Sequence, residues 1–108
     1  MHSAKVSATR VLEDDEFCVV LDDARAQDIA NGFLQRKCFV GPASPAGLCC
    51  VGSFGQDADG TWSAKVAAPL DPSTDSDCEV VARGVERLDA IVALWHARRR
   101  AFLGHYNL

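Results

Sequence analysis

At 108 residues, with 48% hydrophobic and 24% charged residues, the chain has the size and composition of one globular domain. Its formal net charge of −4 argues against general binding to nucleic acid or anionic membranes, since both need a positive field. The longest aliphatic or aromatic runs, at 17–21 and 91–95, are far shorter than the ~20 residues that span a bilayer. We therefore expect one domain over residues 1–108, in the cytoplasm and without membrane contact.

The cysteines also indicate a reducing compartment. The chain has an odd number of them: Cys18, Cys38, Cys49, Cys50 and Cys78. The amino terminus, MHSAKVSATR, has no apolar segment of a secretory signal. Together these features predict free, mostly buried thiols in a cytosolic protein rather than a disulfide framework.

The first half of the chain predicts two strands and a helix. Residues 5–12 begin with alternating apolar and polar residues, which predicts a half-buried strand. After the acidic run at 13–16, FCVVL (17–21) is apolar at every position, as in a strand covered on both faces. From residue 24 to about residue 37, apolar residues recur with the spacing of an amphipathic helix.

The second half predicts a hairpin and a long helix. LCCVGSF (48–54), apolar on both faces, and the alternating TWSAKVA (61–67) flank a turn at 55–60. Lys65 is expected on the wet face of the second strand. The final helix is expected over residues 76–103. This order predicts an α+β fold, an antiparallel sheet of three to four strands with two helices packed on one face in the order ββαββα.

The final predicted helix carries the leading functional hypothesis. Ser76 and Glu79 fit a capping box at its start. The stripe expected to face the sheet contains Val81, Val85, Leu88, Val92 and Trp95. Beyond Asp89 the opposite side also becomes apolar, and about 28 residues of helix extend ~42 Å, past a domain with a radius of gyration of ~13 Å.

An overhanging helix with two apolar sides needs a partner, and the simplest partner is a second copy. We therefore predict a non-enzymatic interaction or regulatory module that forms a homodimer through this helix. The residues expected at the contact are Ala90, Leu94, Ala97, Ala101, Phe102 and Tyr106.

Three consecutive arginines lie near the end of this helix. Arg98 and Arg100 are expected on opposite flanks and Arg99 on the sheet-facing stripe, so they do not form one basic face. We interpret them as marking the end of the core and complementing the helix dipole. Alternatives are a phosphate contact, or pairing of Arg99 with the acidic run of a neighbouring subunit.

Motifs for metal binding and catalysis are weak. His96 and His105 point to different sides of the predicted helix, and Cys49 and Cys50 point to opposite faces of a strand. Cys50 is expected to share a face with Phe54 and to fill the core. We predict no metal, no cofactor and no catalytic residue.

A second hypothesis is a small-molecule-binding protein or small enzyme. The strands at 17–21 and 48–54 carry apolar residues on both faces, although two helices on one side would leave the other side open. A partner subunit, a curled sheet or an apolar ligand must cover that side. The predicted pocket lies between the sheet and the final helix and is lined by Phe54, Trp62, Trp95 and His96.

Overall fold

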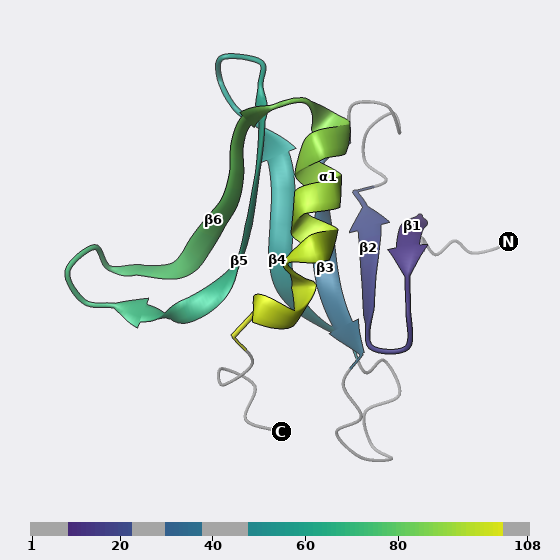
Figure 1. Ribbon diagram of the computed structural model, residues 1–108, viewed down its shortest axis with the longest axis horizontal. Helices are drawn as coiled ribbons and strands as arrows, with labels where there is room; N and C mark the ends of the chain where they lie inside the picture. The colour runs from purple at the N-terminus through teal and green to yellow at the C-terminus, as the bar shows by residue number, and fades with distance from the viewer. Residues whose placement is uncertain (1–8, 23–29, 38–47, 103–108) are drawn as a thin grey trace, which may run out of the picture.

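The computed structural model describes residues 9–22, 30–37 and 48–102 (Figure 1). Six strands pair antiparallel in chain order: β1 (Arg10–Glu13), β2 (Phe17–Leu21), β3 (Gly32–Lys37), β4 (Leu48–Gln56), β5 (Trp62–Asp71) and β6 (Ser76–Val85). They are followed by helix α1 (Arg87–His96) and a 3-10 turn, η1 (Arg98–Arg100). The described part of the chain is thus an antiparallel meander with one α-helix.

The predicted fold class, three to four strands with two helices, is wrong. The strands predicted at 17–21, 48–54 and 61–67 are confirmed, as is the hairpin between the last two. However, the end of the first predicted helix forms β3, and the start of the last predicted helix forms β6. The α-helix that remains has 10 residues, too few for the predicted overhang.

Some predicted segments lie partly or wholly outside the described residues. These are 5–8 of the first strand, 24–29 of the first helix and the end of the final helix after residue 102.

Residues 76–85 form a strand because both their chemistry and their pairing favour it. The β-branched Val80, Val81 and Val85 suit a pleated strand, and β6 pairs along most of β5. The predicted capping box does not form. The Ser76 hydroxyl instead accepts a hydrogen bond from the Cys78 amide within the strand.

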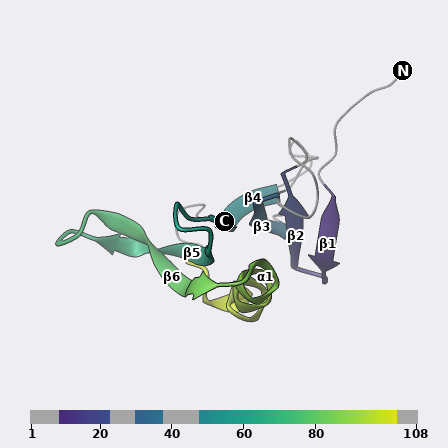
Figure 2. The ribbon, with the colours of Figure 1, turned by 90° about the horizontal axis from the view of Figure 1, so that it is seen from above.

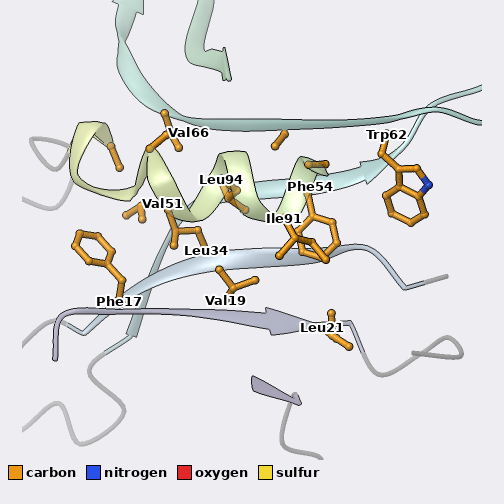
Figure 3. Packing of buried hydrophobic residues seen from close by; sticks show 14 of the residues in the cluster. Phe17, Val19, Leu21, Leu34, Val51, Phe54, Trp62, Val66, Ile91 and Leu94 are labelled. Atoms are coloured by element: carbon orange, nitrogen blue, oxygen red, sulfur yellow. The ribbon is translucent and has the colours of Figure 1, made fainter. Parts of the chain in front are cut away.

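The sheet curves around α1, so that the helix lies against its concave face (Figure 2). Figure 3 shows Leu94 in the middle of the core between helix and sheet. The predicted sheet-facing stripe is wrong for the helix, since Leu88 is 69% exposed and Val92 39% exposed. The buried cluster consists of Phe17, Val19, Leu21, Ala30, Leu34, Val51, Phe54, Trp62, Ala64, Val66, Ala90, Ile91, Leu94, Ala97 and Ala101.

Ion pairs join the three arginines to two parts of the sheet. Arg98 Nε lies 2.9 Å from Asp14 Oδ2, and Arg99 Nη1 lies 2.6 Å from Glu16 Oε1, both in the turn between β1 and β2. Arg100 pairs with Glu79 of β6. Arg99 therefore pairs with the acidic run of its own chain rather than that of a neighbouring subunit. These contacts hold the end of the helix across the concave face, and we name them the arginine latch.

Candidate functional site

The residues predicted for a contact between copies lie mostly in the core. Four of them are buried in their own chain: Ala90, Leu94, Ala97 and Ala101. Phe102 is half-buried, and its amide donates a hydrogen bond to the Ala67 carbonyl. Tyr106 lies outside the described residues. The four buried side chains are not available to a second copy, because α1 and the residues that follow it turn this face toward the sheet. Self-association itself stays a prediction.

Among the hollows formed by the described residues, none is lined by more than one of the residues predicted for a ligand pocket. The Phe54 and Trp62 rings fill the space between sheet and helix, with their centroids 6.2 Å apart, and both are buried. The Arg87 guanidinium lies over both rings. Trp95 is half-buried with Arg98 over its ring, and His96 is exposed. The predicted pocket between sheet and helix is therefore occupied by core side chains.

The opposite, convex face of the sheet carries a row of residues that runs across five strands. Strand register places them side by side in the order Val20, Phe33, Ser53, Lys65 and Val80. Val20 is buried, whereas Phe33 is 38% and Val80 46% exposed. Phe33 and Val80 thus stay accessible on a face that has no described helix over it.

A β-bulge brings Cys50 to this face. Leu34 pairs with Gly52, and the next residue of β3 pairs with Cys50, so Val51 is an extra residue in β4. The bulge changes the alternation of side chains. Cys50 therefore lies on the convex face, whereas Phe54 faces the helix, and the prediction that the two share a face is wrong.

Two adjoining hollows lie on the convex face, and we name them together the convex-face groove. One has a volume of about 380 Å³ and the other about 320 Å³. They adjoin because Phe33, Ser53 and Lys65 line both. The first continues along Cys50, Val51, Gly52, Val66, Ala67, Asp77 and Cys78, and the second along Asn31, Gly32, Phe54, Gly55, Gln56, Asp57, Ser63 and Ala64. The first hollow is mainly apolar, whereas the second has more polar residues.

Two thiols line the first hollow. Cys50 Sγ donates a hydrogen bond to the Gly52 carbonyl, and Cys78 Sγ donates one to Asp77 Oδ1, each over 3.4 Å. Burial raises the pKa of the Cys78 thiol, and the Asp77 carboxylate raises it further. Cys78 is therefore a weak nucleophile at neutral pH. Both thiols serve here as soft, weakly polar lining.

Lys65 is the cation at the middle of the groove. In the part of the chain that the structure describes, no ion pair joins it to a carboxylate. The groove has one carboxylate toward each end. Asp77 accepts a hydrogen bond from the Cys78 thiol, and Asp57 accepts one from the Ser63 hydroxyl over 3.2 Å. Of these residues, the sequence singles out only Lys65, which it predicts on the solvent-exposed face of its strand. Nothing in the sequence pairs Phe33 with Lys65, because their proximity depends on register across three strands.

Within residues 9–22, 30–37 and 48–102, no group of three or more His, Cys, Asp and Glu side chains is placed to hold a metal ion. None of the helices found there is long and apolar enough to cross a membrane. No family model, curated protein or solved structure matches the chain.

Proposed function

We propose that the protein is a binding module whose convex-face groove holds a small, largely apolar ligand. The observation that carries this proposal is the pair of adjoining hollows, since their volumes of about 380 and 320 Å³ fall in the range of small-molecule sites. The mixture of an apolar half with a few polar groups is also typical of such sites. The proposed ligand would cover the second face of the sheet, for which the sequence requires a partner subunit, a curled sheet or an apolar ligand.

Adjacent cysteines on opposite faces provide a direct test. Cys50 lines the groove, whereas Cys49 packs against the core on the helix side. We expect 1-octanol, used as an apolar probe, to slow alkylation of Cys50 by iodoacetamide and to leave the rate at Cys49 unchanged. Site-resolved mass spectrometry measures both rates in one sample. Equal rates at Cys50 with and without octanol would contradict the proposal.

A matched pair of variants locates the effect in the groove. Phe33→Ala removes an exposed ring that lines both hollows, whereas Leu88→Ala removes an exposed side chain from the outer surface of α1. We expect octanol to lose most of its protection of Cys50 in Phe33→Ala and to keep it in Leu88→Ala. Equal protection in both variants would place the octanol elsewhere.

A second proposal is self-association through the outer surface of α1. Leu88 and Val92 lie one helical turn apart, and both are exposed. These two exposed residues take the place of the predicted contact residues that are buried. The hypothesis of a non-enzymatic, homodimeric interaction module is thus retained with a different contact surface. For the location we propose the cytoplasm, since no disulfide joins the cysteines that the structure describes to one another.

A further inference from the structure

We infer that the ligand of the convex-face groove is an amphiphile with a single carboxylate, and that Lys65 is the charge partner of that carboxylate. This inference rests on the proposed function and specifies its ligand class. It begins from the position of Lys65, which lines both hollows. A ligand that occupies either hollow therefore meets the Lys65 side chain.

The surroundings of Lys65 favour an anion. Its cross-strand neighbours in the row, Ser53 and Val80, are neutral, as are Ser63 and Ala67 on either side of it along β5. Lys65 itself is exposed, so its attraction to a ligand carboxylate is that of a surface ion pair, and it strengthens where the ligand's apolar part excludes water from the hollow. Charge complementarity of this kind also orients a ligand in its site.

The two acidic residues of the groove restrict where the anion binds. Asp77 and Asp57 lie toward opposite ends and would repel a carboxylate there. The middle of the groove, at Lys65, is the position where a carboxylate meets a cation. If a ligand had two anionic groups, one would bind at Lys65 and the other would lie near Asp57 or Asp77, which would repel it. The geometry therefore favours a monocarboxylate.

The apolar part of the ligand then follows the first hollow. From Lys65 this hollow runs past Phe33 and Ala67 to the thiols of Cys50 and Cys78. Its volume of about 380 Å³ is enough for an alkyl or aromatic group of moderate size. A medium-chain carboxylate matches both the charge and the apolar lining.

Octanoate and 1-octanol separate this inference from the proposed function. The two probes have the same chain length and differ in the charged group. We expect calorimetry to give up to about fivefold tighter binding for octanoate, as one exposed ion pair contributes up to about 1 kcal/mol. In Lys65→Gln, octanoate is expected to bind no better than octanol, and octanol is expected to bind as in the native protein.

Two further variants complete the experiment. Lys65→Arg keeps the positive charge and is expected to keep the preference for octanoate. Arg83→Gln removes an exposed cation of β6 that does not line the groove, and it is expected to change neither affinity. Equal affinities of the native protein for octanoate and octanol, or an unchanged preference in Lys65→Gln, overturn the inference while octanol binding still supports the groove. Absence of binding by both probes overturns the inference together with the proposed function.

Discussion

Gly52 lies where the side chain of Leu94 contacts β4. A Cβ atom at this position would lie 2.9 Å from the Lys65 carbonyl oxygen and 3.1 Å from Leu94 Cδ1. The first of these contacts is with backbone, which cannot rotate away. We expect Gly52→Ala to lower the free energy of unfolding by about 1–3 kcal/mol, as overpacking a core does.

Gly55 provides the matched control in the same strand. A Cβ atom there would meet its nearest neighbour, Asn31 Cβ, at 3.5 Å, which is an ordinary contact. Gly55→Ala is therefore expected to change the free energy of unfolding by less than about 1 kcal/mol. Because alanine lowers the conformational entropy of the unfolded chain, that change can be a stabilisation. Urea unfolding of both variants measures the difference. Equal destabilisation would show that the close approach at Gly52 is not the cause.

Single residues also explain why the candidate site could not be predicted from the sequence. Phe54 and Trp62 lie on adjacent strands as predicted, but their large apolar rings are buried in the core between sheet and helix rather than lining one pocket there. The extra residue Val51 moves Cys50 to the other face, and strict alternation along β4 gives no sign of it. Bulges depend on pairing with a neighbouring strand, so a local pattern does not contain them.

Strands with unambiguous patterns were predictable, whereas β3 and β6 were not. β2 and β5 have a continuous apolar run and a clear alternation, respectively. In β6, Val81 and Val85 lie four residues apart, which fits a helical stripe as well as a strand. Pairing with β5 decides the outcome, since tertiary contacts outweigh a local helical period. The predicted helix therefore loses its first eleven residues.

The arginine latch is an element-scale feature whose strength depends on pH. Desolvation raises the pKa of Asp14, but hydrogen bonds from the Phe17 and Glu16 amides and from Arg98 outweigh it and hold this pKa below its ordinary value. The hydrogen bond from Arg99 is the main reason why the pKa of Glu16 is also lowered. A lowered folded-state pKa contributes stability that is present above the unfolded-state pKa and is lost as pH falls through the folded-state value.

We therefore expect the free energy of unfolding to be constant near neutral pH and to decrease below about pH 5. Asp14→Asn removes one of the titrating partners and should give a lower stability at pH 7 and a shallower decrease in acid. Asp15→Asn, in the same turn but exposed, serves as the control. Urea midpoints measured between pH 2 and pH 7 test this, and identical curves for the two variants would exclude a role for the latch.

At the scale of the whole molecule, the sheet is curved, but its curvature encloses α1 and does not cover the second face, for which the sequence left a partner subunit, a curled sheet or an apolar ligand open. One short helix covers the concave face because the strands bend around it (Figure 2). The convex face keeps its groove, and the β5–β6 hairpin extends away from the rest of the sheet (Figure 1). Residues 69–80 of this hairpin are all exposed. Composition alone gives no indication of curvature, and the register shifts in β1, β4, β5 and β6 are features that bend strands.

Self-association is the property of the whole molecule that the outer surface of α1 predicts. Leu88 and Val92 form a small apolar surface, and small interfaces give weak complexes, so we expect a homodimer only at high micromolar concentration. Light scattering over a concentration series measures the mass. The double variant Leu88→Glu, Val92→Glu should be monomeric throughout, because charges at the centre of the contact would be desolvated. Leu70→Glu, at a 58% exposed residue of β5 in the extended hairpin, should dimerise like the native chain. A native protein that remains monomeric at these concentrations would leave the convex-face groove as the remaining proposed binding surface, since four of the residues first predicted for the dimer, Ala90, Leu94, Ala97 and Ala101, are buried in their own chain.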